Sequence, residues 1–142
     1  MTNQSRQSQT IVFLLLPNFS MIAFATAIEP LRLANRHLGR PFYKWRLASE
    51  HGGTETASNG CTMAVQTSLA EERRFTGPDR PDMVLVCSGI GVEALDTRQV
   101  RPWLRQLHTA GITIGGLCTA AWVLADAGLL DGRRCVIHWE NL

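Results

Sequence analysis

A run of six apolar residues from Ile11 to Leu16 stands near the start of this chain, and Pro17-Asn18 ends it. A second apolar run extends from Met83 to Cys87 and leads into a glycine-containing loop. A strand that is covered on both faces reads as a continuous apolar run rather than as an alternation, and such strands are typical of parallel sheets. Both runs therefore predict buried strands of a parallel sheet.

Between and after these runs, apolar residues recur at helical spacing. Ser20 is a suitable N-cap for the helix that follows it, and Gly39 lies just beyond the predicted end of that helix. Asp96 or Thr97 is expected to cap a second helix, whose apolar residues at core spacing are Val100, Trp103, Leu104 and Leu107. Gly111 stops this helix before a strand over 112–114. Strands that alternate with helices predict an α/β fold with a doubly wound, mostly parallel sheet.

Less regular segments lie between these elements. Residues 43–49 alternate as a half-buried strand, and the glycine-rich turns after it indicate a hairpin or an extended arm that reaches about Leu69. Near the end of the chain, a helix is predicted over 120–127 and a further strand over 133–139.

Length and composition fit one globular domain, because 45% of the 142 residues are hydrophobic. Residues 1–9 are polar and are expected to form a loose tail, so that the domain covers residues 10–142. The chain ends directly after a predicted strand, with no helix to cover that side of the sheet. We therefore expect it to be truncated at the C-terminus.

The net charge and the cysteines limit which kinds of partner and compartment are expected. The formal net charge is +2 and the basic residues are scattered, which gives no footprint for nucleic acid or a membrane surface. The four cysteines are far apart and have no histidine at zinc-ligand spacing, so we expect no metal, no cofactor and a reducing, cytoplasmic compartment. The uncharged segment from Ile11 to Ile28 is similar to a secretory signal, but Pro17-Asn18 interrupts it, which favours a strand, a turn and a helix.

The most distinctive chemistry surrounds Cys118, which follows a predicted strand and precedes a predicted helix. Gly116 and Ala120 give it the small neighbours of a nucleophile elbow, a strained turn that exposes the central side chain above a sheet. The helix dipole at such a position favours a thiolate. An inert buried cysteine is the alternative. His138 is a candidate partner or a structural histidine, and the loop from Gly89 either presents N–H groups to an anion or is only a turn.

Several motifs occur in one order along the chain: Leu16-Pro17-Asn18-Phe19-Ser20, Ile28-Glu29-Pro30-Leu31-Arg32-Leu33-Ala34-Asn35, Gly115-Gly116-Leu117-Cys118-Thr119 and Ile137-His138-Trp139-Glu140-Asn141-Leu142. On these motifs the chain resembles the amino-terminal sensor domain of AraC-family transcriptional regulators, which belongs to the PfpI, class I glutamine amidotransferase-like superfamily. The resemblance covers about residues 10–142 and implies a flavodoxin-like fold. It also implies a homodimer, and a C-terminal helix-turn-helix domain that binds promoter DNA and lies beyond residue 142.

The resemblance implies that a small polar effector, such as an amino acid or a quaternary amine, binds over the carboxyl ends of the strands. The expected ligand-binding residues are Glu29, Ser88, Gly89, Cys118, Thr119, His138, Trp139 and Glu140. Two of them have an alternative role: Glu29 could instead form an ion pair with Arg32 or Arg36, and Trp139 could instead pack in the core.

The alternative function is that of a cysteine-dependent hydrolase, an amidase, protease or glyoxalase-like enzyme with Cys118 as nucleophile and His138 as base. In enzymes that the chain resembles, an acidic residue of the first helix assists the cysteine. Ala23 aligns with that acidic residue. This departure argues against catalysis and favours a binding role.

Overall fold

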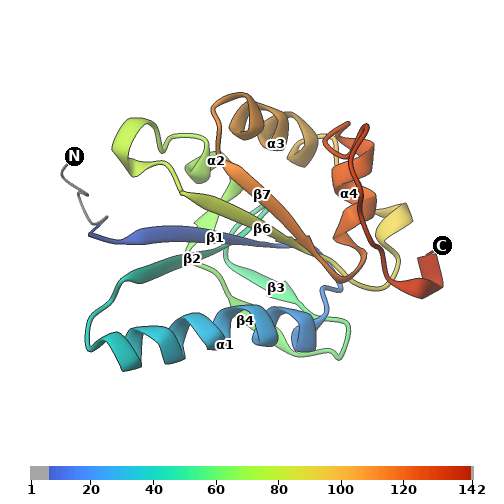
Figure 1. Ribbon diagram of the computed structural model, residues 1–142. Coiled ribbons are helices and arrows are strands. Elements are labelled where there is room, and N and C mark those ends of the chain that lie inside the picture. The colour runs from blue at the N-terminus through green and yellow to red at the C-terminus, as the bar shows by residue number, and fades with distance from the viewer. Residues whose placement is uncertain (1–6, 142) are drawn as a thin grey trace.

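The computed structural model describes residues 7–141, and its centre is a five-stranded parallel sheet (Figure 1). All neighbouring strands of this sheet run parallel, and the two apolar runs predicted as buried strands are neighbours within it. The predicted α/β fold with a mostly parallel sheet is confirmed. In spatial order the strands are β5 (Thr67–Ser68), β2 (Tyr43–Ser49), β1 (Gln9–Leu15), β6 (Met83–Cys87) and β7 (Thr113–Leu117).

Helices cover both faces of the sheet, with α1 (Met21–Leu38) on one face and α3 (Val100–Thr109) and α4 (Ala121–Asp126) on the other (Figure 1). Phe13 of β1 packs with Phe24 of α1, whereas Val12 and Leu14 belong to the cluster that contains α3 and α4. Because successive side chains of a strand point to opposite faces, β1 buries all its residues from Ile11 onward. This two-sided burial explains its uninterrupted apolar sequence.

α1 begins and ends at the residues that the capping pattern predicts. Ser20 has an extended backbone, and its Oγ accepts a hydrogen bond from the N–H of Ala23 at 3.3 Å. Gly39 follows the last turn in the left-handed region, with φ of 68°, a conformation that glycine adopts without a Cβ penalty. The first turn of α1 is thereby fixed directly after β1, at the carboxyl edge of the sheet.

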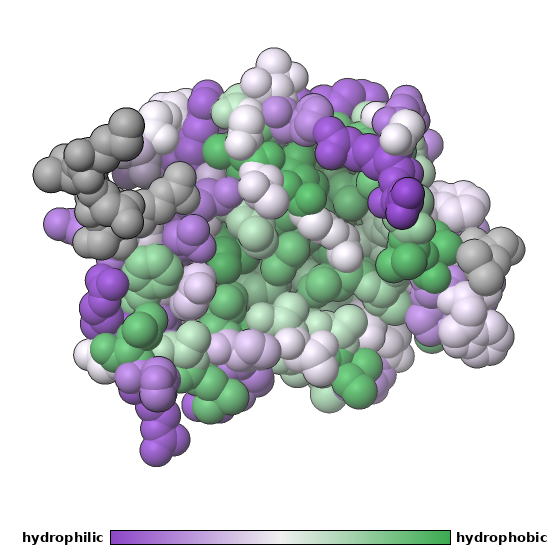
Figure 2. All heavy atoms as spheres, viewed as in Figure 1, coloured by the Kyte–Doolittle hydropathy of each residue, from purple (hydrophilic) through white to green (hydrophobic). Residues whose placement is uncertain are grey.

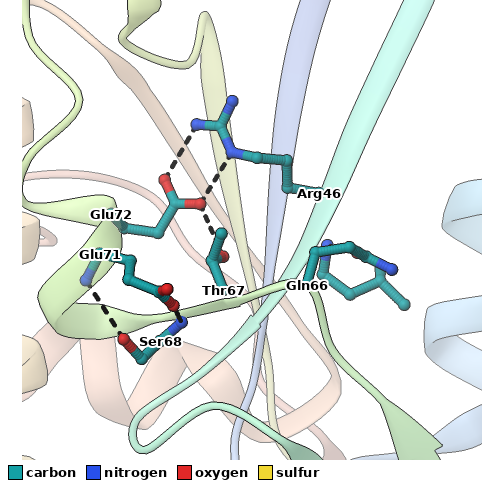
Figure 3. A network of polar contacts seen from close by, with 7 residues as sticks. Arg46, Gln66, Thr67, Ser68, Glu71 and Glu72 are labelled. Carbon is teal, nitrogen blue, oxygen red and sulfur yellow. Dashed lines mark hydrogen bonds and ion pairs between the residues drawn. The ribbon is translucent and has the colours of Figure 1, made fainter.

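A buried ion pair joins β2 to the short helix α2 (Leu69–Glu72) (Figure 3). The Nε and Nη2 atoms of Arg46 donate to the two carboxylate oxygens of Glu72 at 2.8 and 2.9 Å. Thr67 Oγ1 donates to the same carboxylate at 2.8 Å, and the Arg46 guanidinium lies over the Phe75 ring, 4.2 Å from its centroid. These partners offset the cost of burying the Glu72 charge, whose side chain is fully inaccessible to solvent.

The segment between β2 and β5 forms a hairpin, one of the two alternatives that the sequence left open. Its strands β3 (Thr54–Thr56) and β4 (Thr62–Ala64) pair antiparallel. The hairpin is attached to the turn after β1, because Asn18 N donates to Thr56 O and Ser58 N donates to Phe19 O, each at 2.9 Å. These two bonds bring the tip of the hairpin to the carboxyl edge of the central strands.

The prediction of a strand over residues 133–139 is wrong. The chain there is irregular and ends in the short 3₁₀ helix η4 (Trp139–Asn141). Val136 is 89% exposed, so neither a sheet nor a core covers its side chain. A segment with β-branched residues forms a strand only where a neighbouring strand pairs with it and side chains pack against it. Among the described residues, no strand pairs with this segment.

The strand predicted over 112–114 is present as β7 and continues to Leu117. The remaining short helices are η1 (Gly77–Asp79), η2 (Val92–Ala94) and η3 (Cys118–Ala120). Residues 1–6 of the predicted tail lie outside the described residues, and β1 already begins at Gln9. Within residues 7–141, no helix is both long and apolar enough to cross a membrane.

β7 forms an edge of the sheet in the described part of the chain, and its surroundings are apolar. Ile112 and Ile114 are only partly buried against one core cluster, and Leu85 and Leu117 are only partly buried against the other. Figure 2 shows hydrophobic residues gathered over the middle of the view, where Figure 1 places β6 and β7. The sheet is therefore less completely covered at this edge than around β1.

Candidate functional site

A cleft of about 340 Å³ opens at the carboxyl edge of the sheet, where β1, β6 and β7 end. The chain leaves β1 toward β2 on one side and later enters β6 on the other, so this edge is a topological switch point, the usual ligand position in open α/β sheets. The loops after three strands and the tip of the hairpin contribute its lining. The lining residues are Ser20, Ser58, Gly89, Ile90, Gly91, Glu93, Cys118, Thr119, His138 and Glu140.

Cys118 lies on the sharp turn that the sequence predicts. Its φ of 59° places it in the left-handed region, which among the described non-glycine residues only Asn18 shares. Gly116 allows this turn, because a Cβ there would lie 3.0 Å from Leu124 Cδ1 and 3.1 Å from Ala120 Cβ. An L-residue held at positive φ is strained unless its surroundings impose the conformation. The elbow prediction is confirmed, and the Cys118 side chain faces the cleft.

A buried hydroxyl network holds the floor of the cleft under Cys118. Thr119 Oγ1 donates to Gly89 O at 2.8 Å and lies 2.7 Å from Ser88 Oγ. Because the Thr119 hydrogen is used on the carbonyl, the Ser88 hydroxyl is the donor of the second bond. The network ties the loop after β6 to the turn after β7.

Gly89 lets the loop after β6 approach the turn after β1. A Cβ on Gly89 would lie 2.2 Å from the carbonyl oxygen of Asn18, and Ser20 N donates to Ser88 O at 3.1 Å in the same contact. Real Cβ atoms essentially never come this close to backbone. Any larger residue at position 89 would separate the two loops that form the cleft floor.

His138 and Glu140 reach the cleft from the irregular C-terminal segment. His138 Nδ1 accepts a hydrogen bond from Glu140 N at 3.4 Å, lies 3.9 Å from Glu140 Oε2, and its ring stacks on Trp139. No hydrogen bond joins His138 to Cys118 within residues 7–141. The two side chains share one cleft without forming a nucleophile–base pair.

Two residues expected in the ligand site lie elsewhere. Glu29 forms an exposed ion pair with Arg32, with hydrogen bonds of 2.6 to 3.0 Å, and the Arg32 hydrogen bonds lower the pKa of the Glu29 carboxyl. Its alternative interpretation, a pair with a nearby arginine, is therefore the structure that forms. Trp139 is 71% exposed, so it does not pack in the core, and it is not one of the residues that line the cleft. Ser88 lies beneath the floor, whereas Gly89, Cys118, Thr119, His138 and Glu140 line the cleft directly.

Glu93 and Ser58 also line the cleft, although neither was predicted from the sequence. Glu93 belongs to η2 in the loop after β6, which already carried the candidate Gly89, so a carboxylate on that loop was a usable signal. Ser58 sits at the hairpin tip, and its place depends on the attachment of the hairpin to the turn after β1. No local pattern around Ser58 indicates that attachment.

The remaining cysteines differ from Cys118 in their surroundings. Cys87 is buried at the end of β6, and burial raises the pKa of its thiol to about 12. Cys61 and Cys135 are exposed. Among the described residues, no three His, Cys, Asp or Glu side chains cluster in a way that could hold a metal ion.

The sheet is open and parallel, and the cysteine directly after β7 has a left-handed backbone conformation and faces a cleft at the switch point. These features define a flavodoxin-like domain with an elbow cysteine. The model of the DJ-1/PfpI family matches residues 9–141. The chain belongs to the DJ-1/PfpI family, and the resemblance to the PfpI superfamily is confirmed.

The chain is also similar to HTH-type transcriptional regulators. It is 40% identical to GbdR of Pseudomonas aeruginosa over 98% of this chain and 36% of that protein, and 44% identical to CdhR of the same species over 95% of this chain and 38% of that protein. A solved AraC family transcriptional regulator from Pseudomonas putida matches with a TM-score of 0.80 at 28% identity, over 94% of this chain and 68% of that one. The chain thus spans between 36% and 38% of the length of GbdR and CdhR.

Proposed function

We propose that this chain is the effector-binding part of a transcriptional regulator and that its ligand occupies the cleft over Cys118. The observation that supports this most strongly is the alignment of 98% of the chain, at 40% identity, with an HTH-type transcriptional regulator. The cleft at the switch point supplies the pocket that a sensor requires.

The charges of the cleft favour a ligand with a cationic group. Its described lining includes the carboxylates of Glu93 and Glu140 but no lysine or arginine. Both glutamates are exposed, so each contributes about 0.2–1 kcal/mol to a cation rather than the value of a desolvated pair. Backbone N–H groups of the loop that starts at Gly89 are suited to the opposite charge. A zwitterion such as an amino acid or a quaternary amine with a carboxylate fits both ends.

The site is better suited to binding than to turnover. The resemblance places Ala23 at the position of the acid that would assist the cysteine, and the first turn of α1 has no acidic residue. His138 is engaged with Glu140 and not with Cys118. The retained left-handed conformation of Cys118 is the observation that favours the hydrolase alternative. We assign Cys118 to the wall of the ligand site.

The regulator in this proposal is a cytoplasmic homodimer that binds promoter DNA through a helix-turn-helix domain outside these 142 residues. The DNA-binding part of this proposal is supported by GbdR and CdhR, which are HTH-type regulators and are longer than this chain. The chain itself has a formal net charge of only +2, which gives little attraction to phosphates.

Calorimetric titration of the protein with glycine betaine, carnitine and arginine tests the proposal. At least one of them should bind, and Glu93→Gln and Glu140→Gln should each weaken it by up to about fivefold. Glu29→Gln is the matched control, because it removes an exposed carboxylate outside the cleft and should leave the affinity unchanged.

Binding that responds to Glu29 and to neither cleft glutamate would place the ligand elsewhere. Hydrolysis of an ester or amide at a rate that depends on Cys118 would support the enzyme instead.

A further inference from the structure

The cleft over Cys118 continues onto the first turn of α1. A second, more open depression of about 290 Å³ shares Ser20, Cys118 and His138 with the cleft and adds Ile22, Ala23 and Thr26. These three added residues form the apolar lobe. The lobe and the polar cleft, which holds Glu93 and Glu140, therefore meet at Cys118.

The apolar lobe offers surface for hydrophobic contact and little for hydrogen bonding. Ile22 is 77% exposed, a large apolar side chain left in solvent beside the site. The Thr26 hydroxyl donates to Ala23 O at 2.9 Å, and Ala23 N donates to Ser20 Oγ, so these polar groups are already used within the helix. An acidic side chain at position 23 would make this lobe charged, whereas alanine leaves it apolar.

We infer that the apolar lobe is a specificity subsite for a short aliphatic arm of the ligand, whose charged groups lie in the polar cleft. This inference rests on the proposed function, because it assumes that the cleft receives a small molecule. The ligand class is then a zwitterion or cation that carries an uncharged alkyl branch, bent over Cys118. A ligand without such a branch leaves Ile22 in water and gains less from the site.

Cys118 lies between the two lobes, so its modification rate can report on each of them. The 142-residue chain is treated with methyl, ethyl and propyl methanethiosulfonate, and the labelling rate at every cysteine is measured by peptide mass spectrometry. Exposed Cys61 serves as the internal reference for the reactivity of each reagent. At Cys118, relative to Cys61, each added methylene should raise the rate by about two- to fourfold.

Variants separate the lobe from the reactivity of the thiol itself. Ile22→Ala should bring the propyl-to-methyl ratio at Cys118 close to that at Cys61, and Ala23→Glu should do the same. Leu33→Ala is the matched control, because Leu33 is also an exposed apolar residue of α1 but lies outside the lobe. A change in thiolate fraction would alter all rates together and leave this ratio unchanged.

Charged reagents distinguish failure of this inference from failure of the proposed function. A trimethylammonium reagent should label Cys118 faster than a sulfonate reagent, relative to Cys61, because of Glu93 and Glu140. If the labelling rate at Cys118 depends on the charge of the reagent but not on the length of its alkyl group, the apolar lobe is overturned and the polar cleft is left intact.

Length dependence without charge selectivity would support the lobe and contradict the proposed ligand class. Absence of labelling at Cys118 by every reagent would also overturn the apolar lobe, since the apolar lobe and the polar cleft both require this thiol to be accessible.

Discussion

Replacing Thr119 by valine removes one hydroxyl and should cost far more stability than its size suggests. In Thr119→Val the carbonyl of Gly89 loses its donor, and the hydroxyl of Ser88 loses its acceptor. Both groups are buried, with Ser88 only 1% exposed. Each unsatisfied buried polar group costs about 1–3 kcal/mol, so with two such groups the free energy of unfolding should fall by about 2–6 kcal/mol.

The direction of the two hydrogen bonds in this network leads to a second expectation. Ser88→Ala leaves the Thr119 bond to Gly89 intact and should cost only about 1 kcal/mol. In the double variant the orphaned Ser88 hydroxyl no longer exists, so its cost should be lower than the sum of the two single costs. Urea unfolding followed by circular dichroism gives all three values, and Thr113→Val at the exposed start of β7 is the control.

Equal costs for Ser88→Ala and Thr119→Val, or additive costs in the double variant, would refute this order of donors. The reasoning would also fail if Thr119→Val left stability unchanged while Thr113→Val lowered it.

Further predictions concern the ion pair, the elbow and the buried thiol. Glu72→Gln should lower the free energy of unfolding by about 3–5 kcal/mol, because it leaves the Arg46 charge without its carboxylate; a loss below about 1 kcal/mol in urea would contradict the pairing. Cys118→Gly should be more stable than Cys118→Ala by about 1 kcal/mol in the same assay, since the left-handed backbone costs L-residues about 1–2 kcal/mol; the reverse order would argue against the turn. Burial raises the pKa of Cys87 from an ordinary value of 9.0 to about 12, so the unfolded thiol ionises first and stability should fall by about 1.4 kcal/mol per pH unit between these values. Cys87→Ala should lack that part of the fall, and identical pH profiles for the two proteins would contradict it.

Fold prediction succeeded where local pattern and tertiary environment agree. β1 from Ile11 onward and β6 carry apolar residues on both faces, so the runs Ile11–Leu15 and Met83–Cys87 can be recognised without other information. The turn at Cys118 was predictable because Gly116 sits where a Cβ would crowd Ala120 and Leu124. The segment 133–139 contains the apolar run Cys135-Val136-Ile137 but lacks strand partners among the described residues, and a strand depends on those partners.

The candidate site was predictable only as far as the chain places residues directly after strands. Gly89, Cys118 and Thr119 follow β6 and β7 and line the cleft as expected. Glu29 and Glu93 are both exposed glutamates, and only the course of the chain through α1 and η2 decides that Glu93 lines the cleft. Trp139 stacks on His138 without entering the cleft, an orientation that no sequence pattern specifies.

The central claim is that the cleft binds a small charged molecule and returns it unchanged. Ligand-observed NMR of glycine betaine, carnitine and arginine, followed for several hours in the presence of the protein, tests binding and turnover in one measurement. We expect line broadening for at least one ligand, clearly reduced broadening at the same concentrations in the Glu93→Gln, Glu140→Gln double variant, and an unaltered ligand spectrum throughout. Broadening that is undiminished in the double variant, or product signals that vanish with Cys118→Ala, would contradict the claim.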